Sequence, residues 1–134
     1  MKVIVSVPPN YLEIKQHLQP SASAVFCYGD TIFSPSAEEI PADIEYHESI
    51  HQTQQGDNPE MWWKRYLIDP QFRFDQELEA YAHQYLFVKG ALDDKAAKEA
   101  LQEMAENLAS PQYALRITVH GAATEIRLRA KAMV

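Results

Sequence analysis

The sequence has one cysteine, four glycines and no long hydrophobic run among its 134 residues. A single Cys27 cannot form an intrachain disulfide, so the fold must depend on an apolar core, and a reducing cytoplasm suits it. We expect Cys27 to be a small buried residue in a strand. The apolar run at the N-terminus ends at Pro8 and Pro9, which indicates a strand and not a signal peptide. No run approaches the length of a membrane span, so no membrane partner is expected.

Basic residues are also scarce. Lysine and arginine number 12 against 19 aspartates and glutamates, which gives a net charge of -7. That balance disfavours binding to a phosphate backbone, and no nucleic-acid partner is expected. The basic residues of 115–131 are spaced as on a solvated helix face. The length corresponds to a single domain, residues 1–134, that can bury roughly two thirds of its unfolded surface.

The first third of the chain has the patterns of a small sheet. Residues 2–7 are β-branched and alternate in part, as in a strand. Residues 10–18 have helical spacing, with Asn10 as the expected N-cap. Residues 24–34 contain two apolar runs around Gly29-Asp30, which predicts a hairpin.

The rest of the chain has the proline and glycine boundaries of helices. Helices are expected over 41–56, 58–69, 70–90 and 92–110. Residues 113–119 allow a strand, but a last helix capped at Thr118 is favoured. The order of elements predicts an α+β fold, with a small N-terminal sheet packed on a helical core.

The segment 43–57, DIEYHESIHQTQQGD, places two histidines four residues apart around a glutamate. Positions i and i+4 of a helix share a face, so His47 and His51 can bind one metal ion, and zinc accepts imidazole at about 2.0–2.1 Å. Glu48 lies about 100° round the helix from His47, beside the metal and within reach of its water. That is the place of a general base. The alternative is a polar helix face with its histidines in water.

Catalytic zinc requires a third protein ligand and an open fourth position. The segment 74–85 of a later helix supplies two candidates. Glu77 shares a face with Phe74 and Tyr81, so it can project from an apolar surface toward the metal. Glu79 lies about 200° further round the helix from it and is the alternative third ligand. Both glutamates would be solvated surface residues if no metal binds.

The motifs HESIHQTQQ and ELEAYAHQ, within residues 30–87, resemble those of the gluzincins. These metallopeptidases carry HExxH on one helix and a ligand glutamate on a later one, and the chain is most similar to small gluzincin-like proteins of phages and bacteria. The resemblance implies a zincin-like fold in which Glu77 is the ligand and Ala80 its usual companion. Tyr81 stands where the family usually has an acidic or amide residue, which leaves the group that orients a ligand histidine unassigned.

The resemblance also implies a role for a strand before the HExxH helix, and other residues near the motifs are candidates on their own chemistry. An edge strand that pairs with an extended peptide substrate would correspond to residues 30–34. His83 and Tyr85 are candidates to donate a hydrogen bond to a transition-state oxyanion. Trp62 and Trp63 point to different sides of a helix, so one is expected in the core and one partly exposed, with core packing the favoured role of both.

The sequence therefore predicts a zinc metallopeptidase of the gluzincin type, with zinc on His47, His51 and Glu77 and with Glu48 as general base. Its partner would be a peptide or protein substrate. Two other hypotheses are a non-catalytic zinc-containing structural or interaction module of a phage or bacterium, and a metal-free helical scaffold. An intact Glu48 favours the enzyme, whereas a fourth coordination position closed by His83 would favour the structural module. The sequence leaves the specificity and the oligomeric state open.

Overall fold

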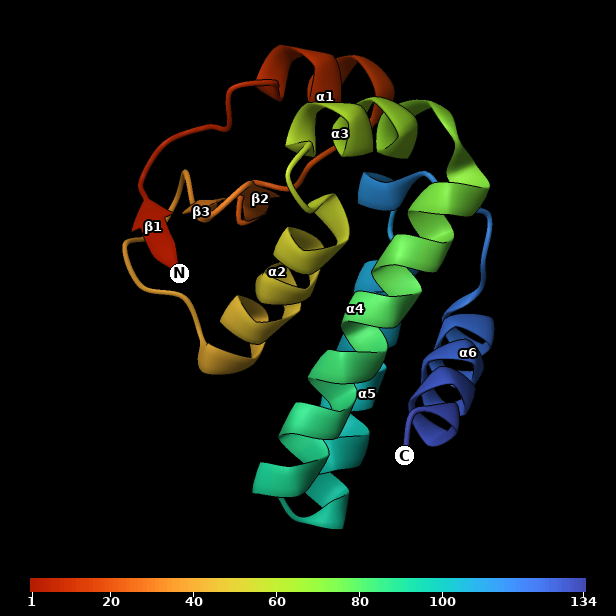
Figure 1. Cartoon of the computed structure of the whole chain (residues 1–134). Helices are drawn as coiled ribbons and strands as arrows, with labels where there is room; N and C mark the ends of the chain where they lie inside the picture. Colours follow the sequence, from red (N-terminus) through yellow and green to blue (C-terminus); the bar gives the residue numbers. More distant parts are fainter.

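A small sheet lies at one end of a group of six α-helices in the computed structural model, which describes residues 1–134 (Figure 1). The α+β class expected from the sequence is confirmed. No helix combines the length and apolar character that crossing a membrane requires. The elements in chain order are β1 Lys2–Ile4, α1 Tyr11–His17, β2 Phe26–Tyr28, β3 Thr31–Phe33, α2 Ala42–Gln55, α3 Pro59–Ile68, α4 Pro70–Ala91, α5 Asp94–Leu108, the 3-10 helix η1 Pro111–Tyr113, and α6 Val119–Ala132.

The sheet has the strand order β1-β3-β2, with β1 parallel and β2 antiparallel to β3. The hairpin between β2 and β3 turns at Gly29, whose φ of 63° is easily adopted only by glycine. The prediction that residues 30–34 form an edge strand is wrong, because β1 pairs with the second side of β3 and makes it the central strand. The edge strand near α2 is β2 instead.

Two N-terminal features differ from the sequence prediction. The expected strand over 2–7 is only three residues long, because the backbone turns where the Ser6 amide bonds to the Ile4 carbonyl. Asn10 does stand at the N-cap position of α1, but its side chain makes no capping hydrogen bond. Its φ and ψ of -101° and 24° lie outside the extended conformation that turns a side-chain oxygen toward the helix amides.

The last ambiguous segment is a helix, as favoured from the sequence. The Thr118 hydroxyl accepts a hydrogen bond from the Gly121 amide at 3.0 Å and starts α6. Asn58, Asp69 and Asp93 cap α3, α4 and α5 in the same way. Such caps satisfy amides that the first turn of a helix leaves without a backbone partner.

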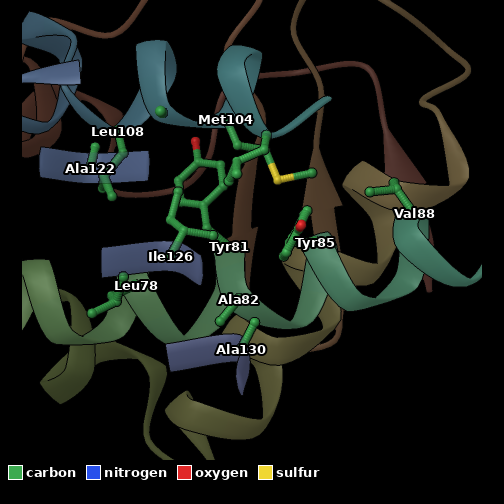
Figure 2. Close-up of a cluster of buried hydrophobic side chains, with 12 residues drawn as sticks. Leu78, Tyr81, Ala82, Tyr85, Val88, Met104, Leu108, Ala122, Ile126 and Ala130 are labelled. Carbon is green, nitrogen blue, oxygen red and sulfur yellow. The ribbon is translucent and has the colours of Figure 1, made fainter. Parts of the chain in front are cut away.

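The apolar core is divided into two separate clusters of buried side chains. The larger one joins α4, α5 and α6 through residues such as Tyr85, Met104 and Ile126 (Figure 2). The smaller one joins α1, β2 and α3 and contains Trp62 and Trp63. Core packing of both is as favoured from the sequence, but the expectation that one of them is partly exposed is wrong, because both are buried. Helix α2 packs against α4 and β2, so its inner face lies between the elements of the two clusters (Figure 1).

Candidate metal centre

Every buried side chain of α2 is polar: His47, Glu48, His51 and Gln55. Burying polar groups is unfavourable unless each finds a partner, so a helix that buries only such groups is not held by apolar packing alone. His47, His51 and Gln55 are four residues apart and share one face, with Glu48 about 100° round the helix from His47, and this side of α2 meets α4 and β2. The arrangement indicates that the inner face of α2 has a role beyond packing.

The side chains of His47, His51 and Glu77 converge in this buried region. Nε2 of His47 lies 3.2 Å from Oε1 of Glu77, and Nε2 of His51 lies 3.2 Å from Oε2. Their possible ligand atoms all lie within 4.8 Å of one another, and all three residues are buried. Donor atoms around a tetrahedral zinc ion with bonds of about 2.0–2.1 Å are about 3.3 Å apart. This group could therefore hold a metal ion.

The structure brings Glu77, and not Glu79, to the two histidines. Glu77 is 3% exposed, and its second oxygen accepts a hydrogen bond from the Tyr66 hydroxyl at 2.5 Å. Glu79 is half-buried and accepts from the Gln54 side chain at 3.1 Å. Glu77 is thus one of the possible metal ligands, whereas Glu79 is linked to His51 only through the Gln54 side chain.

The charges in the group depend on one another. Burial opposes the charged form of His51, but the charge of Glu77 and its hydrogen bond raise the pKa of His51 to about 9. Burial likewise opposes ionisation of Glu77, yet the charge of His51 and hydrogen bonds from both histidines hold the pKa of Glu77 below its usual value. Without metal, a proton on His51 therefore neutralises Glu77 near neutral pH. A metal cation can replace that proton.

Glu48 lies beside the group without belonging to it. It is 4% exposed, and its Oε2 is buried with no hydrogen-bond partner. Burial, opposed by the nearby His51 and His47 and aided by Glu77, raises the pKa of Glu48. A buried carboxylate oxygen without a partner is rare in folded proteins and is typical of functional positions.

A cavity of about 270 Å³ opens onto these residues. Its walls come from α1, the segment between α1 and β2, β2, α2, α3, α4, α5 and η1, and they include His47, Glu48, His51 and Glu77. The hydroxyls of Tyr81 and Tyr113, which are 2.7 Å apart, belong to side chains of the same cavity. A small molecule or part of a peptide can therefore reach the group from this side.

The sequence candidates His83 and Tyr85 do not line the cavity. The ring of His83 lies against that of Tyr46 at 6.2 Å between centroids, outside the metal group, so it does not close a fourth position. Tyr85 is part of the larger core cluster (Figure 2). Tyr113, which was not a candidate from the sequence, lines the cavity from the short 3-10 helix η1.

On the side of each histidine ring away from Glu77, Nδ1 is hydrogen-bonded to a glutamine side chain. Oε1 of Gln84 lies 2.9 Å from Nδ1 of His47, and Oε1 of Gln54 lies 2.7 Å from Nδ1 of His51. Tyr81, at the place where the gluzincin pattern has an acidic or amide residue, instead packs its ring 4.4 Å from that of His47. Gln84 was not singled out in the sequence, although it stands on the same helix as Glu77 and seven residues after it.

No protein-family model matches the chain, and no curated protein or solved structure matches it. The resemblance to gluzincins therefore depends on the sequence motifs alone.

Proposed function

We propose that this protein is a zinc-dependent peptidase of the gluzincin type, with a zincin-like fold, that hydrolyses a peptide or protein substrate. The observation that supports it best is the buried group of His47, His51 and Glu77, next to a Glu48 oxygen that is buried without a partner. The two histidines come from α2 and Glu77 comes from the later helix α4, which is the order of the motifs in gluzincins.

The donor set favours zinc and a catalytic use of it. Two imidazoles and one carboxylate are ligands of catalytic zinc, whereas structural zinc sites have four protein ligands and are rich in cysteine. The buried group here has three such residues and no cysteine, and it faces a cavity. An open position toward the cavity is what a substrate carbonyl or a water would need.

The residues around the cavity suit the steps of amide hydrolysis. Bound zinc would polarise the substrate carbonyl and lower the pKa of a water to about 7. Glu48, whose Oε2 has no hydrogen-bond partner, would accept a proton from the attacking water and donate it to the leaving amine. The raised pKa of Glu48, caused mainly by its burial, makes its carboxylate a stronger base than that of an exposed glutamate.

The tyrosine pair can supply a donor for the oxyanion. Only one of the two hydroxyl protons is used in the bond between Tyr81 and Tyr113, so the other is free to donate into the cavity. Arg73 fixes the loop that carries Tyr113, since its guanidinium donates to the Tyr113 carbonyl at 2.6 Å and to the Tyr66 carbonyl at 2.7 Å. Ala114 next to it has a φ of 51°, a conformation that is unfavourable for alanine and common at functional sites.

The test compares the zinc content and the peptide cleavage of Glu48→Gln with those of the wild type. The variant should keep its zinc and its melting temperature, while hydrolysis falls by about 10²–10⁴-fold. Glu45→Gln is the matched control, because Glu45 is on the same helix with a side chain that is 45% exposed. Equal cleavage by Glu48→Gln and the wild type would contradict the role of Glu48. Tight zinc binding by both proteins without any cleavage would instead support the non-catalytic zinc module.

A further inference from the structure

Each histidine of the metal group is the first member of a three-residue chain of hydrogen bonds that ends at a carboxylate. Behind His47, the Gln84 side chain accepts at Oε1 and donates from Nε2 to Oδ2 of Asp43 at 2.8 Å. Behind His51, the Gln54 side chain accepts at Oε1 and donates from Nε2 to Oε1 of Glu79 at 3.1 Å. Gln54 also donates to the backbone carbonyl of Gln76 at 2.9 Å.

The carboxylates of Asp43 and Glu79 at the ends of these chains determine how the side-chain amides of Gln84 and Gln54 are oriented. An ionised carboxylate and a backbone carbonyl only accept hydrogen bonds, so the NH2 group of each glutamine must face them. The amide oxygen is then turned toward Nδ1 of the histidine. Because an amide oxygen only accepts, Nδ1 must carry the hydrogen.

A histidine whose Nδ1 carries the hydrogen offers Nε2 to a metal. In both residues Nε2 is the atom that faces Glu77, at 3.2 Å. A bare Nε2 and a carboxylate oxygen are both acceptors, and a metal ion between them would bind to both. The orientation of the two glutamines thus sets which ring nitrogen of His47 and His51 can bind.

We propose that Gln84 and Gln54 are positioning residues that hold both histidines with Nε2 free for the metal, and that Asp43 and Glu79 act by orienting these amides. This inference rests on the metal site of the proposed function. It gives Glu79 a role as an orienting carboxylate. It also predicts that the two chains differ in strength, because Gln84 depends on Asp43 alone, whereas Gln54 has the Gln76 carbonyl as a second acceptor.

The sharpest variant is therefore Asp43→Asn. An asparagine at this position can donate to the amide oxygen of Gln84, so the amide can reverse and present its NH2 group to Nδ1 of His47. The zinc dissociation constant should rise by about 10–100-fold, the usual effect of losing an orienting group behind a ligand. Glu79→Gln should have a smaller effect, because the Gln76 carbonyl still orients Gln54.

Two comparisons separate orientation from charge. Glu103→Gln removes a negative charge from an exposed residue of the same cavity that makes no hydrogen bond to the histidine chains, and it should leave the zinc dissociation constant nearly unchanged. The double variant Asp43→Asn with Gln84→Glu keeps the net charge and exchanges the two functional groups. The carboxylate introduced at position 84 would then accept from His47, while the amide introduced at position 43 donates to that carboxylate. Most of the lost zinc affinity should therefore return.

A spectroscopic measurement reports the histidine state without any need for activity. Long-range proton–nitrogen correlation spectra of the zinc-bound protein should show, for His47 and His51, a hydrogen on Nδ1 and metal on Nε2. In zinc-saturated Asp43→Asn, the Nδ1 hydrogen of His47 should exchange with solvent faster, while that of His51 should not change.

The outcomes are distinct. Wild-type protein that binds no zinc would overturn the metal site, and with it both the proposed function and this inference. Zinc binding through Nδ1, or equal losses of affinity in Asp43→Asn and Glu103→Gln, would overturn the positioning role alone. A double variant as weak as Asp43→Asn would do the same.

Discussion

The Tyr66 hydroxyl donates to Oε2 of Glu77 at 2.5 Å, so the carboxylate that faces both histidines is also held from α3. Both side chains are buried, at 3% exposure each. The hydrogen bond joins the first helix after the HExxH segment to the helix that supplies the third candidate ligand. It therefore fixes the direction in which Glu77 presents its oxygens to the two histidines.

The first prediction follows from this bond. Tyr66→Phe removes the hydroxyl from a buried carboxylate, and a hydrogen bond to a charged group contributes about 1.5–3 kcal/mol. The free energy of unfolding of metal-free protein should fall by about that amount, and the zinc dissociation constant should rise by about 10–100-fold. Urea unfolding with chelator and a zinc competition titration measure the two effects. Tyr46→Phe is the control and should match the wild type, because Tyr46 lies on α2 outside the metal group and is 36% exposed.

The second prediction concerns the pair of Glu79 and Glu77. Glu77→Ala removes a candidate ligand and should abolish tight zinc binding, because catalytic zinc requires three protein ligands. Glu79→Ala removes a residue whose hydrogen bond goes to Gln54 and not to a candidate ligand, so it should weaken binding much less. In the wild type, zinc at about 100 times its dissociation constant should stabilise the fold by about 2.7 kcal/mol, and this gain should be absent from Glu77→Ala. A reversed order of the two variants would move the ligand to Glu79.

The third prediction is a pH dependence of the metal-free protein. The folded pKa of His51 is raised from 6.5 to about 9, so its contribution to stability is complete below pH 6.5 and is lost as the pH rises toward 9. The folded pKa of Glu77 is lowered from 4.5, so its contribution is complete above pH 4.5 and is lost as the pH falls below that value. Unfolding in urea with chelator should therefore show a maximum of stability between pH 4.5 and 6.5.

The same shift predicts proton release on zinc binding. At pH 7 the wild type should release about one proton per zinc, mostly from His51, because zinc binds only the neutral imidazole. Calorimetry in buffers of different ionisation enthalpy counts the protons. His17→Gln changes an exposed histidine and should leave both the count and the stability profile unchanged. A stability that stays constant from pH 6.5 to about 9 would contradict the role given to His51.

The parts of this site that a sequence reveals are those set by spacing within one helix. His47, Glu48 and His51 are placed by the geometry of α2 alone, and Glu77 by its face of α4. Their mutual distance is set by the packing of α2 on α4, which the motifs suggested only by resemblance.

The features that the sequence did not reveal depend on contacts between distant residues. Strand β3 is central because residues 2–4 pair with residues 31–33, and no local pattern records that pairing. Gln84 contacts a histidine 37 residues away, and Tyr113 reaches the cavity because Arg73, 40 residues before it, holds its carbonyl. Asn10 shows the reverse case, in which a good capping residue stands at the right position but adopts a backbone conformation that prevents the bond.

The last prediction tests the tyrosine pair against the candidate taken from the sequence. Tyr113→Phe removes a hydroxyl at the cavity and should lower kcat by about 10²–10³-fold, as the loss of one oxyanion donor does, with zinc affinity unchanged. Tyr85→Phe should leave kcat unchanged, because Tyr85 lies in the core cluster and not at the cavity (Figure 2). Tyr81→Phe removes the partner of the Tyr113 hydroxyl and should have an intermediate effect, since Tyr113 keeps its proton but loses the bond that directs it. Steady-state kinetics on a cleaved peptide, with zinc content measured in each variant, decides between them. A large loss in Tyr85→Phe with none in Tyr113→Phe would mean that the oxyanion lies on the other side of α4, and the direction of substrate approach argued from the cavity would be wrong.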